Sequence, residues 1–148
     1  MELVAKRFNE LSLDEYHELL KLRCAVFLVE QQSPYQEVDD ADKEAIHLYF
    51  RNDEGALAAY ARVLPAGVTH PTASIGRVIA VERGCGMGRR IMEEAIRVGE
   101  KAGIPVIISH LKVIGKQNEG LSQKVLQVIE EANARGVKVR ADQYPYLR

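Results

Sequence analysis

Residues 75–92 have the sequence IGRVIAVERGCGMGRRIM, which joins a strand-like run to a glycine-rich turn and then to a helical pattern. The first half is apolar and β-branched, which predicts a buried strand that ends near Val81. A helix is expected from about Met87. A strand, a glycine turn and a helix start form a site for an anion, because the first backbone N–H groups of a helix have no partner within it.

The turn combines backbone freedom with positive charge. Glycine lets backbone N–H groups approach a phosphate closely, and the helix start adds roughly half a positive charge. Arg83, Arg89 and Arg90 add full positive charges. Two interpretations are open: a cradle for a pyrophosphate, or a tight strand-to-helix turn with solvated arginines. We favour the cradle, because a strand precedes the glycines and three arginines accompany them.

Composition predicts one soluble globular domain over residues 1–148. A chain of 148 residues can bury a core of its own, and its 47% hydrophobic and 28% charged content is typical of a globular protein. The net charge of −1 creates no overall attraction for nucleic acid or for an anionic membrane, so we expect neither as a partner. The sequence has no signal peptide and no apolar run that would cross a bilayer, so we expect a cytoplasmic protein.

The two cysteines, Cys24 and Cys85, are too few for a disulfide framework or a metal set. Both are expected to be reduced thiols, Cys24 within a helix of the core. Cys85 lies in the glycine turn beside arginines, which favours a reactive thiolate. No histidine lies near it in the sequence to act as a base, so we expect an unreactive thiol.

The order of the expected elements predicts an α/β (α+β) fold with a mixed sheet. An antiparallel meander comes first and a β-α-β unit follows, an order that gives helices on both faces of the sheet. Ser12 and Glu15 form a capping box at the start of the first helix. Helices are expected at residues 13–29, 87–102 and 122–135, and strands at 4–8, 46–50, 57–64, 74–81, 104–111 and 137–141.

Residues from about 8 to 98 resemble the GNAT acyltransferase superfamily, and within it the ElaA-like group. The run VFLVEQQSPYQEVDDAD at residues 26–42 is fairly specific to that group. AYAR at residues 59–62 and IGRV at residues 75–78 continue the match. The pattern Arg83-Gly84-x-Gly86-x-Gly88 resembles the acyl-CoA loop of the superfamily.

This resemblance implies a GNAT fold that uses acetyl-CoA as co-substrate and acetylates a small-molecule or peptide amine. The end of the strand would present backbone groups to the pantetheine and the thioester carbonyl, and the loop N–H groups would hold the pyrophosphate. The implied cofactor-binding residues are Val78, Ile79, Ala80, Val81, Arg83, Gly84, Cys85, Gly86, Met87, Gly88 and Arg89.

The acidic loop supplies the candidates on the substrate side. Clustered acids attract a cationic amine, which makes Tyr35, Asp39 and Asp42 the expected substrate residues. Either Glu30 or His47 is the expected catalytic base. A solvated acidic loop with no role in binding is an equally good interpretation.

Residues from about 100 to 146 resemble a different family, the N-acyl-D-amino-acid deacylases, which are metal-dependent amidohydrolase barrels. The specific parts are SHLK at residues 109–112 and DQYPY at residues 142–146. In that family the residue matching His110 would bind a metal. A catalytic zinc site needs about three protein ligands, and the other histidines do not have the family's spacing, so we expect no metal site.

The two resemblances together indicate a chimera, with a GNAT-like segment at residues 1–98 and a β-α-β segment at residues 99–148 that completes the sheet. The connection from the strand to the glycine turn is short for the ElaA-like group. No tyrosine occurs in residues 121–135 to protonate a leaving thiolate. The last two strands either pair directly in parallel or leave an exposed edge that favours a homodimer. The hypotheses are an N-acetyltransferase, a folded chain that binds CoA without turnover and, against the missing ligands, a metal hydrolase.

Overall fold

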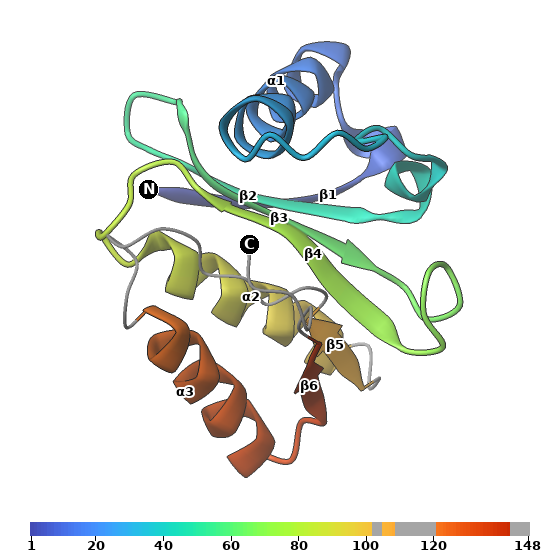
Figure 1. Cartoon of the computed structure of the whole chain (residues 1–148), viewed down its shortest axis with the longest axis vertical. Coiled ribbons are helices and arrows are strands. Elements are labelled where there is room, and N and C mark those ends of the chain that lie inside the picture. Colours follow the sequence, from blue (N-terminus) through green and yellow to red (C-terminus); the bar gives the residue numbers. More distant parts are fainter. Residues whose placement is uncertain (102–104, 109–120, 143–148) are drawn as a thin grey trace.

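The computed structural model describes residues 1–101, 105–108 and 121–142 (Figure 1). The strands are β1 (Glu2–Arg7), β2 (Ile46–Arg51), β3 (Leu57–Leu64), β4 (Ala73–Ala80), β5 (Val106–Ile108) and β6 (Val139–Ala141). The helices and helical turns are η1 (Phe8–Glu10), α1 (Leu13–Arg23), η2 (Cys24–Glu30), η3 (Asp40–Glu44), α2 (Met87–Lys101) and α3 (Leu121–Ala134).

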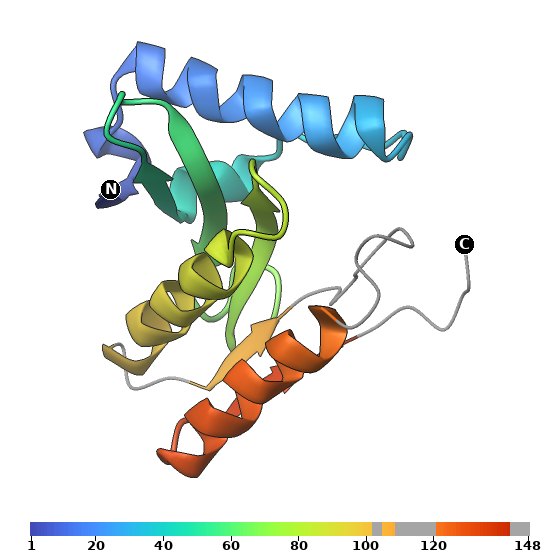
Figure 2. The ribbon, with the colours of Figure 1, turned by 90° about the vertical axis from the view of Figure 1, so that its left-hand side faces the viewer.

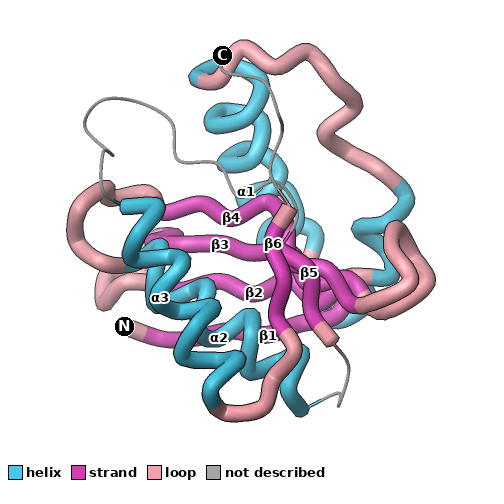
Figure 3. Tube along the Cα trace, turned by 60° about the horizontal axis from the view of Figure 1, so that its bottom comes forward, coloured by secondary structure: helices cyan, strands magenta, loops and turns pink. Residues whose placement is uncertain are grey.

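The described strands form one mixed sheet in the order β1-β2-β3-β4-β5-β6. Strands β1 to β4 pair antiparallel, which includes the predicted meander of β2, β3 and β4, and β4, β5 and β6 pair in parallel. Figure 3 shows the strands of the sheet side by side. The last two strands therefore pair directly with each other, the first of the two expected arrangements. Residues 104 and 109–111 of the expected fifth strand, and the expected loop that follows it, lie outside the described residues.

Helices cover both faces of the sheet, so the predicted fold class is confirmed. Helix α1 packs on one face, and α2 and α3 pack on the other (Figure 1). Side chains alternate along each strand, which divides the core into two layers. Tyr49 and Tyr60 lie in the layer under α1 with Leu19, whereas Leu48 and Ala61 lie in the layer under α2.

The first helix begins where the capping box predicted and ends in an unexpected form. The Ser12 side chain accepts a hydrogen bond from the backbone of Glu15, whose carboxylate accepts one from the Ser12 backbone. The α-helix stops at Arg23, and η2 continues it as a π-helix up to Glu30. Figure 2 shows the two as one rod. The predicted end near residue 29 is correct, but periodicity did not reveal the change of helix type, which often marks functional sites.

Helix α2 approaches β5 closely at a glycine. A Cβ atom at position 99 would lie 2.2 Å from Cγ2 of Val106, which is fully buried. Gly99→Ala is therefore expected to lower the free energy of unfolding by about 1–3 kcal/mol, because the added methyl group must displace the helix or the strand. Urea unfolding followed by circular dichroism measures this loss.

Gly88→Ala is the matched control for this prediction on the same helix. Its Cβ would lie 3.8 Å from Cβ of Ala80, an ordinary contact, and alanine favours a helix more than glycine does. We expect no loss of stability in this variant. If Gly99→Ala were as stable as the wild type, α2 and β5 would not pack as closely as they do here.

Candidate functional site

The carboxyl-terminal half of β4 contains a bulge. Tyr60 of β3 pairs with Ile79 of β4, and Arg62 of β3 pairs with Gly76 of β4. Between these pairs, one residue of β3 lies opposite two residues of β4. The extra residue in β4 is assigned to Arg77, whose φ of 56° lies in the left-handed region that favours glycine. A bulge of this kind bends the strand and changes the direction of its side chains.

The bulge coincides with the end of the pairing between β4 and β5. The last paired residues of these strands are Ile75 and Ile108. Within the described part of the chain, residues 76–80 pair with β3 alone. Backbone groups along the other edge of this segment are the ones predicted to contact pantetheine and the thioester. Four of the predicted cofactor-binding residues lie here or directly after it: Val78, Ile79, Ala80 and Val81.

The glycine turn joins this segment to α2 and is exposed. Gly84 and Gly86 have φ values of 83° and 82°, which glycine adopts without strain. The carbonyl of Gly86 accepts a hydrogen bond of 3.1 Å from the N–H of Arg90, so Gly86 is the residue that starts the helix. The N–H groups of Met87 and Gly88 lie in the first turn of α2, so they have no acceptor within the helix. The geometry therefore fits an anion site.

Two of the three arginines of the turn, Arg83 and Arg89, pair with different acids. Arg83 forms an ion pair with Glu30, which joins the turn to the end of η2. Arg89 instead pairs with Glu93 at 2.8 Å and with Glu131 of α3 at 3.3 Å. The charge of Arg83 therefore lies between the turn and the expected substrate side. The charge of Arg89 is directed toward α3. The thiol of Cys85 is exposed and lies 3.0 Å from the carbonyl of Glu82.

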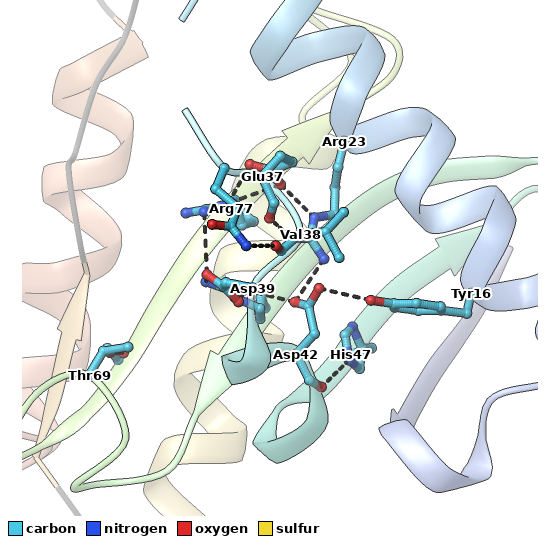
Figure 4. A network of polar contacts seen from close by, with 12 residues as sticks. Tyr16, Arg23, Glu37, Val38, Asp39, Asp42, His47, Thr69 and Arg77 are labelled. Carbon is cyan, nitrogen blue, oxygen red and sulfur yellow. Dashed lines mark hydrogen bonds and ion pairs between the residues drawn. The ribbon is translucent and has the colours of Figure 1, made fainter. Parts of the chain in front are cut away.

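Beside the bulge, a set of charged side chains is buried between α1 and the sheet (Figure 4). Arg23, with no exposed surface, donates from Nε to Glu37 at 2.6 Å and from Nη1 to Asp42 at 2.9 Å. Arg77 donates to both oxygens of Glu37, at 3.0 and 2.9 Å. We call Arg23, Glu37, Asp39, Asp42, Arg62 and Arg77 the buried ion-pair network.

Two predicted substrate residues belong to this network. Arg62 binds Asp39 at 2.6 Å and Asp42 at 2.7 Å. Asp42 is 1% exposed and also accepts a hydrogen bond of 3.0 Å from Tyr16. A solvated loop is therefore wrong for Asp42, because its Oδ1 accepts from Arg23 and Arg62 and its Oδ2 accepts from Tyr16. The substrate role of Asp42 stays a prediction that this placement does not favour. Asp39 and Tyr35 keep exposed surface.

His47, one of the two predicted bases, is completely buried. Its Nε2 lies 2.9 Å from the carbonyl of Asp42 and its Nδ1 lies 2.9 Å from the hydroxyl of Tyr60. Burial lowers the pKa of His47, so the ring is neutral and donates from Nε2 to the carbonyl. The base role of His47 stays a prediction that this placement does not favour. Glu30 is half exposed beside the turn.

The network also sets the charge state of Asp42. Burial alone would raise the pKa of Asp42, but the charges and hydrogen bonds of Arg23 and Arg62 outweigh it and hold the pKa below its ordinary value. Burial, the charge of Asp42 and the hydrogen bond to it raise the pKa of Tyr16 to about 12. At neutral pH the Asp42 carboxylate is therefore charged and the Tyr16 hydroxyl is neutral.

These shifts predict how stability depends on pH. The pKa values of His47 and Asp42 are both lower in the folded state, so the unfolded chain takes up protons first as the pH falls. Stability is expected to be full above about pH 6.5, to fall below it as His47 protonates in the unfolded chain, and to fall again below about pH 4 through Asp42. Urea unfolding at a series of pH values measures both steps.

His47→Gln is expected to remove the upper step and to leave the lower one. His17→Gln, at an exposed position on α1, is the control and should keep both steps. Stability of the wild type that stays constant between about pH 7 and pH 5 would contradict the role of His47.

Arg23, Glu37, Arg62 and Arg77 were missed as site residues by sequence reasoning, although a signal existed for Arg23 and Arg62. Arg23 follows Leu19 by four residues, on the face of α1 that packs on the sheet. Arg62 follows Tyr60 by two residues on the same face of β3. Charged residues at core positions need buried partners, and the acidic loop was the available source.

No group of three or more His, Cys, Asp or Glu side chains that would hold a metal ion occurs among the described residues, and His110 lies outside them. The absence of a metal site stays a prediction. None of the described helices is both long and apolar enough to cross a membrane.

Comparison with known proteins gives relatives at high identity over the larger part of the chain. A UPF0039 protein of Schizosaccharomyces pombe is 41% identical over 103 residues, which are 68% of this chain and 67% of that protein. Protein ElaA of Escherichia coli is 42% identical over 93 residues, 60% of each chain, so the match spans less than two thirds of ElaA. No family model matches the chain.

Solved structures agree with these relatives. An acyl-CoA N-acyltransferase from Pseudomonas aeruginosa superposes with a TM-score of 0.65 at 39% identity, over 71% of this chain and 75% of that one. Escherichia coli ElaA superposes with a TM-score of 0.64 at 36% identity, over 71% and 74% of the two chains.

A partial match of a different kind accompanies them. D-aminoacylase of Alcaligenes xylosoxydans is 46% identical over 56 residues, which are 38% of this chain and 11% of that protein. A match this short is consistent with a fragment. The expected second resemblance is thereby confirmed.

Proposed function

This chain belongs to the ElaA-like group of GNAT acyl-CoA N-acyltransferases, and from this premise we propose that it transfers an acetyl group from acetyl-CoA to a primary amine. The observation that carries the proposal is the exposed glycine turn between the end of β4 and the start of α2. Side chains at Gly84 and Gly86 would require strained backbone at the point where a pyrophosphate would contact N–H groups.

The proposed chemistry is a direct attack. The neutral amine nitrogen forms a bond to the thioester carbonyl carbon, the C–S bond breaks, and CoA leaves as a thiolate that takes up a proton. A backbone N–H of residues 78–80 would hold the developing oxyanion, whereas the N–H of Val81 already donates to the carbonyl of Ala58 at 2.9 Å. Glu30 is the proposed base, because its carboxylate is half exposed and lies beside the turn.

The acceptor is proposed to be a small-molecule or peptide amine that approaches between η2 and the bulge. Tyr35 and Asp39 are the predicted substrate residues that remain partly exposed there. Burial and a hydrogen bond to Glu37 raise the pKa of Tyr35 to about 12, so its ring presents a neutral hydroxyl. A cytoplasmic location, a homodimer and the absence of nucleic-acid partners remain expectations that belong to this proposal.

The partial match to D-aminoacylase favours a second candidate function, a folded chimera that binds CoA without turnover. The described helix α3 contains no tyrosine to protonate the leaving thiolate. This candidate shares the cofactor site with the first, so only turnover separates the two.

Calorimetric titration of the purified chain with acetyl-CoA tests the cofactor site. A dissociation constant in the micromolar range, about −8 kcal/mol, is the expected result. Acetyl transfer to a panel of amines, followed by release of free thiol, then distinguishes the enzyme from the chain without turnover. A folded sample that does not bind acetyl-CoA would contradict both candidate functions.

The ion pair between Glu30 and Arg83 leads to a further prediction. A pyrophosphate must compete with the Glu30 carboxylate for Arg83. Glu30→Gln is therefore expected to raise the affinity for acetyl-CoA by about two- to fivefold, the scale of an exposed ion pair. The same variant should lose acetyl transfer if Glu30 is the base.

Glu18→Gln is the control, because it removes the same charge from an ion pair with Arg51 that includes no residue of the turn. It should leave the affinity for acetyl-CoA unchanged. If the affinity of Glu30→Gln were equal to that of the wild type or weaker, Arg83 would not be shared between the carboxylate and the phosphate.

A further inference from the structure

The direction of the Arg77 side chain depends on the bulge. In a regular strand, the residue after Gly76 would lie opposite Ala61, whose side chain is buried in the layer under α2. The extra residue instead lets Arg77 reach the α1 side, where its partners lie. Val78 then packs under α2 and Ile79 under α1, so the alternation of the strand resumes.

An arginine at this position is unfavourable for the backbone alone. The left-handed conformation is strained for a residue with a Cβ, whereas glycine adopts it freely. Such strained residues persist only where the surrounding contacts hold them, and they gather at functional sites. The side chain of Arg77 must therefore provide contacts that a glycine would lose.

Those contacts tie β4 to the acidic loop and to α1. Nε of Arg77 donates to both carboxylate oxygens of Glu37, and Nη2 lies 3.8 Å from Asp39. The guanidinium also lies over the rings of Tyr35, at 5.2 Å, and Phe27, at 6.0 Å. Glu37 is itself fixed, because Arg23 donates to the same carboxylate from α1 and to the Glu37 carbonyl at 2.8 Å.

We propose that Arg77 is a positioning residue for the acyl group. Its ion pair with Glu37 fixes the bulge, so that the backbone of residues 78–81 contacts the thioester in one geometry. This inference rests on the proposed acyl-CoA site. Arg77 is proposed to act through the backbone that follows it, because the contacts of its guanidinium are with Glu37, Asp39 and the two rings. The glycine turn, by contrast, holds the nucleotide end without this contact.

The test compares two ligands, acetyl-CoA and adenosine 3′-phosphate 5′-diphosphate, the nucleotide portion of CoA. The nucleotide reaches only the glycine turn, whereas acetyl-CoA also reaches the bulge. Arg77→Gly keeps the backbone conformation without strain and removes the ion pair with Glu37. We expect it to lose about tenfold or more in affinity for acetyl-CoA and less than about twofold for the nucleotide.

Two further variants separate positioning from structure. Arg77→Lys keeps the charge but not the rigid planar fork, and it should recover part of the affinity for acetyl-CoA. Arg51→Gly, the same change at the end of β2, should leave both affinities unchanged. A merely structural role would lower the unfolding temperature of Arg77→Gly and weaken both ligands in parallel, which would overturn the inference.

The outcomes for the wild type and for Arg77→Gly are distinguishable. A wild-type chain that binds neither ligand overturns the proposed function, and this inference with it. A wild-type chain that binds both, with an Arg77→Gly variant of unchanged affinity for acetyl-CoA, overturns the inference alone.

Discussion

Arg23→Met is expected to lower the free energy of unfolding by about 3–5 kcal/mol, because removal of one member of a buried ion pair leaves its partners as uncompensated charges. Arg23 has no exposed surface, and the side chains of its partners Glu37 and Asp42 are each 1% exposed. Methionine fills a similar volume without making hydrogen bonds. Urea unfolding at neutral pH measures the loss.

Arg97→Ala is the control for this experiment. Arg97 pairs with Glu94 on the exposed side of α2, and alanine is a good helix former. Exposed pairs contribute about 0–1 kcal/mol, so little change is expected. Arg23→Lys should fall between the two variants, because one ammonium cannot reproduce the planar fork that reaches both acids. Similar stabilities for Arg23→Met and Arg97→Ala would show that the network contributes no more than a surface pair.

The second large effect is expected at the glycine turn. Gly86→Val should weaken the binding of acetyl-CoA by about tenfold or more, because valine disfavours a φ of 82° and its side chain would cover the N–H groups at the start of α2. Calorimetry measures the affinity, and circular dichroism confirms that the variant is folded.

Gly67→Val provides a matched control for the backbone effect. Gly67 has a φ of 89°, lies in the loop between β3 and β4, and has open space around it, as Gly86 does. The two variants therefore carry the same strain, and only Gly86→Val should lose affinity. Equal affinities for acetyl-CoA in the two variants would mean that the turn does not contact the cofactor.

Local sequence signals predicted most of the fold. The capping box placed the start of α1 at residue 13. The sequence Asn-Asp-Glu-Gly at residues 52–55, which is typical of a hairpin turn, predicts the turn between β2 and β3. Gly136, with a φ of 88°, ends the last helix as predicted. These features depend on backbone preferences within a few residues, which a single sequence displays directly.

The candidate site was only partly predictable, because its parts meet through the fold. The glycine turn is continuous in the sequence and was identified. The buried ion-pair network joins residues 14–40 positions apart, and nothing local distinguishes Asp42 in a buried pair from an acid on a solvated loop. The bulge at Arg77 was also invisible, since its evidence is the register between β3 and β4.

The buried ion-pair network bears on which segments of such a chain can be exchanged in evolution. Within the described residues, every partner that we find for the network comes from residues 16–77, and none comes from α2, α3, β5 or β6. The α1 side of the sheet is therefore a self-contained module. Exchange of the described β5, α3 and β6 by recombination would leave these contacts in place, and apolar side chains of similar volume replace one another in a core at modest cost. Evolution can thus test new carboxyl-terminal segments while the charged half of the molecule stays intact.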